Sequence, residues 1–188
     1  MTRFEPLDLP GLVLVTPAVH GDPRGFFLER WKASVYAAHG IGPFVQANRS
    51  RSARGVLRGL HWQVAPHRQG KLVSVASGEI LDVAVDLRRG SPTFGRWAAA
   101  VLDDREHRQM WVPPGFAHGF VVRSESADVL YETTAEYAPD AERGLAWDDP
   151  DLGIDWGVAT PTLSGRDRER PRLCELGAND LFDREDDT

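Results

Sequence analysis

The chain has 188 residues, a formal net charge of -6, and hydrophobic and charged fractions of 41% and 27%. These values predict one globular domain with a core of its own. An acidic balance argues against nucleic-acid binding, which needs an extended basic surface, and no apolar run has the length of a membrane span. The single cysteine, Cys174, excludes an internal disulfide. Together with a start that lacks a signal-peptide pattern, this predicts a cytoplasmic protein.

In chain order, the sequence predicts many short strands separated by turns that are rich in glycine and proline. The predicted strands cover residues 12–15, 26–31, 45–50, 56–62, 71–76, 80–87, 97–102, 109–112, 118–122 and 129–137. One short helix is predicted over 32–39, because Gly40 follows in the position typical of a helix end. This pattern predicts an all-β protein with a jelly-roll barrel and few short helices. Residues 1–188 are expected to form that single domain, with the charged terminus 183–188 frayed.

A basic segment stands out against the acidic composition. No acidic residue occurs between Glu29 and Glu79. The cations of this stretch include Lys32, Arg49, Arg51, Arg54, Arg58, Arg68 and Lys71. A local cluster of cations in an acidic protein favours a small anionic ligand, such as one that carries phosphate. His61 lies in the same segment, which makes it a candidate general base, although a lone histidine in a strand more often has a structural role.

The two histidines predicted on strands, His61 and His118, raise the alternative of a metal-dependent barrel enzyme. A metal site needs three or more His or carboxylate ligands, often including a His-x-His pair. In this chain Gln63 stands where the second histidine of such a pair would be, and the cationic Lys71 follows closely. The sequence therefore predicts a barrel without a metal ion.

Other polar residues are expected to have structural roles. Asp82 and Asp86 are predicted to pair with arginines, and the alternative is that they support the site residues from behind. His118 follows a rigid Pro-Pro-Gly turn, and a buried histidine bonded to the backbone is one interpretation of it.

Seven motifs, in order and with matching spacing, resemble the dTDP-4-dehydrorhamnose 3,5-epimerase family. They lie at residues 22–31, 46–48, 55–63, 81–88, 91–95, 115–120 and 163–167. The resemblance runs from about Leu12 to Leu173. It implies a cupin-type jelly roll that acts on a dTDP-sugar and uses neither a metal nor an organic cofactor. It also implies a homodimer that exchanges N-terminal strands from within about residues 1–50.

The resemblance implies a role for each matching residue. His61 matches the general base, Asp167 its carboxylate partner, Tyr131 the opposing acid and Lys71 a cation near the sugar ketone. Tyr137 is close enough in sequence to be an alternative acid. The residues implied in substrate binding are Arg24, Glu29, Gln46, Asn48, Arg58, His118, Glu142 and Arg166. Of these, Glu29 is expected to contact the nucleotide held by the partner subunit.

The implied chemistry agrees with the properties of these side chains. The protons at C3 and C5 of the sugar flank the C4 ketone, so removing either one gives an enolate whose oxygen Lys71 can stabilise. An imidazole titrates near 6.5 and accepts a proton at neutral pH, whereas a phenol titrates near 10 and can donate one. The alternatives are a single-carbon epimerase of a related deoxysugar, a metal-dependent cupin enzyme and a non-catalytic cupin that binds a sugar nucleotide.

Overall fold

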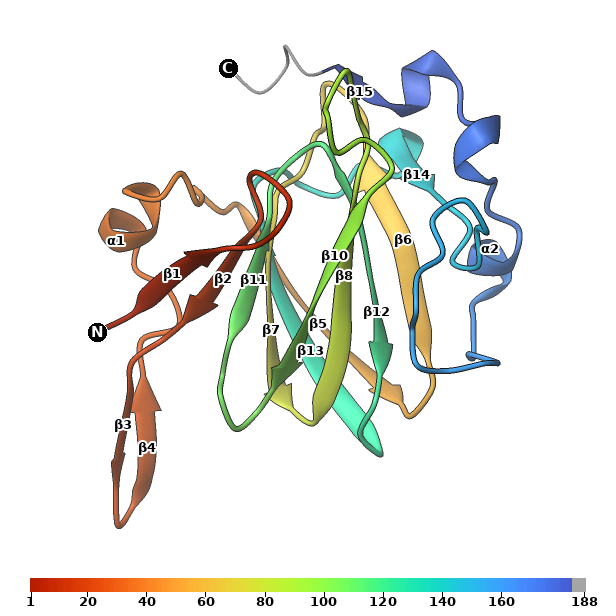
Figure 1. The fold of residues 1–188 in the computed structure, drawn as a ribbon. Coiled ribbons are helices and arrows are strands. Elements are labelled where there is room, and N and C mark those ends of the chain that lie inside the picture. The colour runs from red at the N-terminus through yellow and green to blue at the C-terminus, as the bar shows by residue number, and fades with distance from the viewer. Residues whose placement is uncertain (184–188) are drawn as a thin grey trace.

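Two antiparallel β-sheets face each other in the computed structural model, which describes residues 1–183 (Figure 1). The six-stranded sheet has the order β1 (Arg3–Pro6), β2 (Val13–Thr16), β11 (Gln109–Val112), β7 (Lys71–Ser77), β13 (Ser126–Thr133) and β5 (Gln46–Ala53). The five-stranded sheet has the order β10 (Trp97–Asp103), β8 (Glu79–Asp86), β12 (Phe116–Val122), β6 (Leu57–Gln63) and β14 (Glu142–Gly144). The predicted all-β jelly-roll barrel is confirmed.

Strand β8 shows how the sequence builds the layers. Its side chains alternate between the two faces of the sheet, as the pleat requires. Ile80 and Ala84 face the core between the two sheets, whereas Val83 and Val85 belong to a second core on the outer face. Burying one such aliphatic side chain stabilises the fold by roughly 1.5–3 kcal/mol. The barrel wall is therefore apolar on both faces where it does not border the cavity described below.

The C-terminal segment covers the outer face of the five-stranded sheet (Figure 1). Its short elements are η1 (Pro139–Ala141), α2 (Gly165–Arg168), η2 (Leu173–Glu175), η3 (Ala178–Asp180) and β15 (Phe182–Asp183), which pairs with β9 (Arg88–Arg89). The indole of Trp62 donates to the carbonyl oxygen of Asp180 at 2.8 Å, and that of Trp156 donates to Trp147 at 2.8 Å. These bonds hold the segment, and with it α2, against the barrel.

The predicted frayed terminus lies mostly outside the described residues. Asp183 is its only described member, and it is part of β15 and forms an ion pair with Arg89 at 2.6 Å. The fraying of residues 184–188 stays a prediction.

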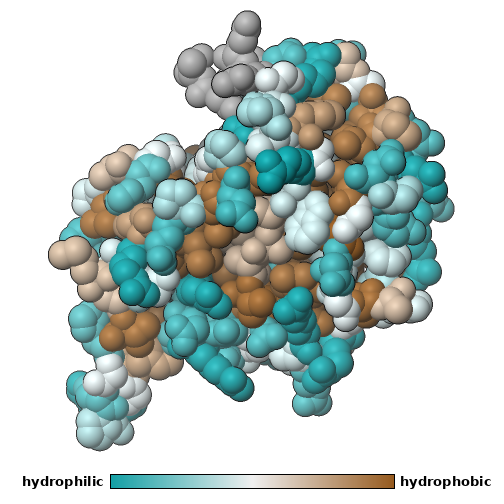
Figure 2. All heavy atoms as spheres, in the orientation of Figure 1, coloured by the Kyte–Doolittle hydropathy of each residue, from teal (hydrophilic) through white to brown (hydrophobic). Residues whose placement is uncertain are grey.

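The N-terminal region contributes an outer cover and a projecting arm. Helix α1 (Ala33–Ala37) is shorter than predicted, and Gly40 follows it with a left-handed φ of 71°. Tyr36 on this helix is buried against the outer face of the six-stranded sheet. The hairpin of β3 (Val19–Asp22) and β4 (Gly25–Leu28) extends away from the barrel (Figure 1). Figure 2 shows polar side chains at its tip and apolar ones where it joins the body.

Two predicted strands end earlier than expected. The strand predicted over 26–31 ends at Leu28, and the one predicted over 129–137 ends at Thr133. Beyond Thr133 the carbonyl oxygens of Ala135 and Glu136 accept hydrogen bonds from glutamine side chains instead of a neighbouring strand. The sequence pattern did not predict β1, β3, β9, β14, β15 or α2, which are all short.

Within residues 1–183, no helix combines the length and apolar character needed to cross a membrane.

Candidate active site

A cavity of about 640 Å³ lies between the two sheets, bounded on one side by α2 and the chain around it. Ten of the twelve residues with expected roles line it: Gln46, Asn48, Arg58, His61, Lys71, His118, Tyr131, Glu142, Arg166 and Asp167. They come from strands of both sheets and from the C-terminal segment, so residues separated by more than a hundred positions meet in one space.

His61 and Asp167 form a hydrogen-bonded pair at this cavity. Nε2 of His61 on β6 lies 2.5 Å from Oδ1 of Asp167 on α2, and their side chains are 30% and 5% exposed. Ser164 caps α2 by accepting a hydrogen bond from the backbone N–H of Asp167 at 3.1 Å. Because Nε2 is bonded to the carboxylate, Nδ1 is the ring nitrogen that can accept a proton from a bound molecule.

The charge of Asp167 is stabilised although the side chain is buried. Burial alone would raise the pKa of Asp167. The hydrogen bond and charge of His61, the hydroxyl of Ser164 and the charge of Arg170 lower it by more, so the net pKa lies below the ordinary value. The carboxylate is therefore ionised at neutral pH. It can hold the imidazole tautomer and stabilise an imidazolium after proton transfer.

A second histidine–carboxylate pair lies deeper in the same sheet. His118 on β12 is directly opposite His61 on β6, and its Nε2 lies 2.8 Å from Oδ1 of Asp82 on β8. The His118 and Asp82 side chains are 8% and 0% exposed. The prediction that Asp82 pairs with an arginine is therefore wrong, whereas Asp86 does bond to Arg88, at 2.9 Å.

Two glycines allow β6 and β12 to bring these histidines together. Gly59 has a φ of 126°, and a Cβ atom on it would lie 2.5 Å from the Cα atom of Gly119. A Cβ on Gly119 would in turn lie 2.8 Å from the carbonyl oxygen of Arg58. The register between the strands shifts at this point. Close approach of two bare backbones is therefore what positions His118 beside His61.

Lys71 and Tyr131 reach the cavity from the opposing sheet, where β7 and β13 are paired. The ammonium group of Lys71 donates to the carbonyl oxygen of His61 at 3.3 Å. Burial lowers the pKa of Lys71 to about 8, although the charges of Asp82 and Glu142 oppose the shift. Burial also raises the pKa of Tyr131 above its ordinary value, against a smaller effect of Arg58. At neutral pH the lysine is mostly a cation and the tyrosine is a proton donor.

Alternate residues of β5 present polar groups to the cavity. Gln46, Asn48 and Ser50 all line it, as the two-residue period of a strand predicts. The side-chain amide of Gln46 donates to Oδ1 of Asn48 at 2.9 Å, and Nε of Arg58 donates to Ser52 at 3.0 Å. Amides, hydroxyls and a cation side by side suit a ligand with anionic and hydrogen-bonding groups.

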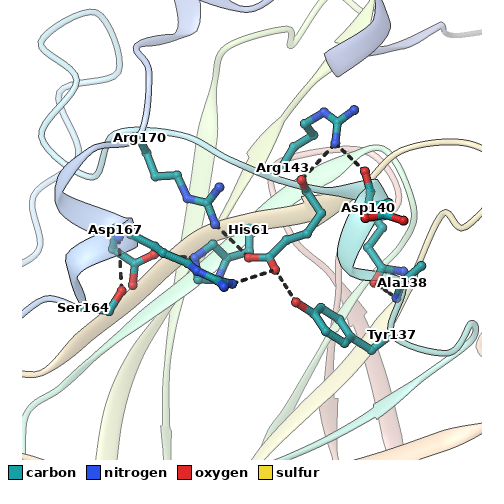
Figure 3. A network of polar contacts seen from close by, with 11 residues as sticks. His61, Tyr137, Ala138, Asp140, Arg143, Ser164, Asp167 and Arg170 are labelled. Carbon is teal, nitrogen blue, oxygen red and sulfur yellow. Dashed lines mark hydrogen bonds and ion pairs between the residues drawn. The ribbon is translucent and has the colours of Figure 1, made fainter.

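Glu142 organises the side of the cavity nearest α2, where it binds Tyr137 and Arg170, which are both labelled in Figure 3. It accepts hydrogen bonds from Tyr137 at 2.5 Å and from Arg170 at 2.7 Å, and Arg166 lies 4.0 Å away. Burial raises the pKa of Glu142, but the bond from Tyr137 and the charges of His61 and Arg170 bring it below its ordinary value. Tyr137 thus lies at the cavity with its hydroxyl already bonded to a carboxylate, whereas no such bond engages Tyr131 within residues 1–183.

The two remaining predicted site residues do not line this cavity. Arg24 lies at the tip of the projecting hairpin, where its guanidinium forms a 2.5 Å ion pair with Asp22 and its side chain is 90% exposed. Glu29 follows β4 and is exposed. The expectation that they act in a partner's site stays a prediction.

The structure adds cavity residues that sequence reasoning missed, among them Ser50, Ser164 and Arg170. The pattern of β5 could have indicated Ser50, because it continues the alternation of Gln46 and Asn48. A serine three residues before an acidic residue is typical of a helix start, so the sequence could have indicated Ser164 as a helix cap beside Asp167. Nothing near Arg170 distinguishes it from its neighbouring arginines.

Within residues 1–183, no group of three or more His, Cys, Asp or Glu side chains is arranged to bind a metal ion. The two histidines of the cavity are each bonded to a carboxylate instead.

Comparison with known proteins identifies the family. The family model described as dTDP-4-dehydrorhamnose 3,5-epimerase matches residues 6–175. The enzyme of that name from Pseudomonas aeruginosa is 53% identical over 167 residues, which cover 87% of this chain and 91% of the relative. The chain belongs to the dTDP-4-dehydrorhamnose 3,5-epimerase family.

Solved structures of this epimerase family have the same fold. The dTDP-6-deoxy-D-glucose-3,5-epimerase of Legionella pneumophila, in complex with dTDP-4-keto-L-rhamnose, superposes with a TM-score of 0.94. It is 44% identical, and the match covers 97% of this chain and 98% of that one. A 3'-monoepimerase of Streptomyces bikiniensis, in complex with dTDP-quinovose, gives a TM-score of 0.85 at 37% identity, covering 90% and 87% of the two chains. Epimerases of one and of two carbons therefore share this architecture.

Proposed function

We propose that this chain epimerises dTDP-4-dehydro-6-deoxy-D-glucose at C3 and C5 and produces dTDP-4-dehydro-L-rhamnose. The observation that carries the proposal is the pairing of His61 with Asp167 on one side of a cavity whose other side presents Tyr131 and Lys71. Inversion at carbon requires a base on one face of the sugar and an acid on the other. The names of the relatives support the substrate class and the two carbons.

In the proposed reaction, His61 removes the proton from the carbon beside the C4 ketone. The electrons of the C–H bond move into a C–C double bond, and the ketone becomes an enolate. The cationic Lys71, which lines the same cavity, stabilises the charge that develops on the oxygen. Asp167 stabilises the imidazolium that results.

Tyr131 completes each inversion by returning a proton from the opposite face. Its phenol is protonated at neutral pH because a tyrosine ordinarily titrates near 10, and burial raises its pKa further. Before the cycle repeats at the second carbon, His61 releases its proton to solvent and Tyr131 takes one up from it. Both centres are then inverted with no net change in protons or electrons. Each proton-transfer partner is typically worth about 10²–10⁴-fold in rate.

The nucleotide and the sugar have separate contacts in this proposal. Gln46, Asn48 and Arg58 hold the diphosphate and nucleoside, because they supply the amides and the cation on the β5 side of the cavity. Arg166 adds a positive charge from α2, where its side chain is 81% exposed. His118 and Glu142 contact the sugar.

We also propose a homodimer in which the β3–β4 hairpin reaches the partner's cavity with Arg24 and Glu29. Its support is the projecting arm of Figure 1, on which the Phe26 and Phe27 side chains are 61% and 70% exposed. Large exposed aromatic side chains on a protruding hairpin are typical of an interface. Mixing Arg24→Ala chains with His61→Asn chains should restore activity, because one site of each mixed dimer has every residue. Mixed dimers without activity would contradict the shared site.

A single-carbon epimerase remains the second candidate, because the 3'-monoepimerase of Streptomyces bikiniensis has the same architecture. Product analysis by NMR in deuterated water separates the two. Inversion with deuterium at both C3 and C5 supports the proposal, inversion at one carbon supports the second candidate, and no deuterium at either carbon contradicts both.

Two tyrosine variants test the assignment of the acid. Tyr131→Phe keeps the base, so the enolate should form and take deuterium back from the original face, with little inversion. Tyr137→Phe should still invert both carbons. The opposite result would exchange the roles of the two tyrosines.

A further inference from the structure

Arg170 lies beside the His61–Asp167 pair, although nothing in the sequence indicated a role for it. It follows α2, three residues after Asp167, and Nη2 of its guanidinium donates to Oε1 of Glu142 at 2.7 Å. The Arg170 and Glu142 side chains are 18% and 17% exposed. Figure 3 shows Arg170 extending from the side of Asp167 toward His61. The cation is thus held near the proposed base and largely away from solvent.

Gly144 on β14 makes room for this side chain. A Cβ atom at Gly144 would lie 2.2 Å from Nε and 2.6 Å from Cζ of Arg170. The guanidinium therefore lies against bare backbone. Its Nε is buried and has no hydrogen-bond partner within residues 1–183. Packing on Gly144 and the ion pair with Glu142 fix the position of the charge.

The surroundings of His61 explain why a cation is needed there. Asp167 is bonded to the ring, and Glu142 interacts with it through charge. Two carboxylates beside one imidazole favour the imidazolium, which cannot accept a proton. Burial raises the pKa of both carboxyl groups, but Arg170 contributes to lowering each of them, so its charge acts on both carboxylates that contact or interact with His61.

We propose that Arg170 is a positioning residue that keeps His61 in its neutral, proton-accepting form by balancing the charge of Glu142. Through Glu142 it also fixes the hydroxyl of Tyr137 at the cavity. The inference rests on the proposed function, in which His61 is the base.

Other ionisable groups line the cavity with His61 or, in the case of Asp82, bond to a residue that does, and an Arg170 variant removes none of them. They are Arg58 from β6, Lys71 from β7, Asp82 from β8, His118 from β12, Tyr131 from β13, Tyr137 from the segment before η1, Glu142 from β14, and Arg166 and Asp167 from α2. A change in the pH dependence of an Arg170 variant would therefore report the loss of one cation.

The test compares the pH profile of kcat/KM for wild type and Arg170→Met, which keeps an unbranched side chain over Gly144 but removes the charge. The acidic limb of the profile should move to higher pH by about half a unit to one unit. A shift of this size is expected when one nearby charge is removed from a partly solvated site. Arg170→Lys should restore most of the wild-type profile.

Two further variants separate charge from packing. Arg168→Met removes an exposed cation from the last residue of α2, two positions before Arg170. Arg168 does not line the cavity, so its loss should leave the limb unchanged. In the double variant Glu142→Gln/Arg170→Met a carboxylate and a cation are lost together, so the acidic limb should return toward that of wild type.

An NMR titration of the His61 ring in the enzyme without substrate keeps this inference separate from the proposed reaction. If wild type shows no deuterium exchange at C3 or C5, the proposed function fails, but the titration still reports the effect of Arg170. An unmoved His61 titration in a folded Arg170→Met variant would overturn the inference. So would an equal shift in Arg170→Met and Arg168→Met.

Discussion

The cavity contains two histidine–carboxylate pairs that differ in burial and in the origin of the carboxylate. In His61–Asp167 the histidine side chain is 30% exposed, and its partner comes from the C-terminal segment, 106 positions away. In His118–Asp82 both side chains are buried, and the partner comes from the neighbouring strand β8. A proton-transfer group must reach its substrate, whereas a buried pair mainly fixes geometry. The same two residue types therefore serve different purposes, and their surroundings decide which.

The largest expected effect separates the two histidines. His61→Asn should lower kcat/KM by at least about 10²–10⁴-fold and abolish deuterium exchange at C3 and C5, because no base remains to form the enolate. His118→Asn should keep deuterium exchange and raise KM. Exchange is measured by NMR, and thermal unfolding of each variant serves as the control for folding. Near wild-type exchange in His61→Asn would show that the base is another residue.

Substitutions of the two carboxylates should also have different effects, one on catalysis and the other on stability. Asp167→Asn preserves a polar partner but loses the charge that stabilises the imidazolium, so kcat should fall by about 10²–10⁴-fold with little change in stability. Asp82→Asn should instead lower the free energy of unfolding by about 1.5–3 kcal/mol, the usual worth of a hydrogen bond to a charged group. Urea unfolding and steady-state kinetics on both variants provide the measurement. Equal effects of the two substitutions would remove the distinction between the pairs.

The alkaline side of the pH profile of kcat/KM should report Lys71, whose pKa is lowered to about 8 by burial. The protonated form stabilises the enolate, so kcat/KM should fall as pH rises through about 8, by about tenfold per unit at higher pH. The charge of Asp82 supports protonation of Lys71. Asp82→Asn should therefore move this alkaline limb to lower pH, whereas Lys71→Arg should remove it. A limb that stays in place in Lys71→Arg would assign it to another group.

The smallest expected effect is that of a chelator. Because the two histidines of the cavity are each bonded to a carboxylate, dialysis against a strong chelator should leave kcat and KM unchanged. A large loss of activity that one divalent metal restores would show that these pairs serve as metal ligands.

Much of the fold could be predicted because its signals are local. The alternation of apolar residues in β8 and the turn residues between strands indicated a barrel of short strands. The elements that were missed, such as β14 and α2, have three and four residues. Segments this short carry no periodic signal, and contacts with β6 and with the His61 side chain are what order them.

For the site, the sequence by itself determined the types of residue that could act. His61, Lys71, Tyr131 and Asp167 were named through a family resemblance, and local chemistry explained why each type suits the reaction. Which carboxylate serves which histidine was decided only by the tertiary structure. Asp82 lies nearer to His61 in the sequence than Asp167 does. It nevertheless bonds to His118, because β8 and β12 are paired.

Arg170 gives the clearest case of a residue whose role tertiary structure alone decided. It stands among several arginines in a polar tail, and nothing local distinguishes it from Arg168. Only the packing of that tail on β14, where Gly144 leaves room, carries its charge to Glu142 and the proposed base. Electrostatic interactions depend on distance in space and on burial, and neither quantity is encoded by position along the chain.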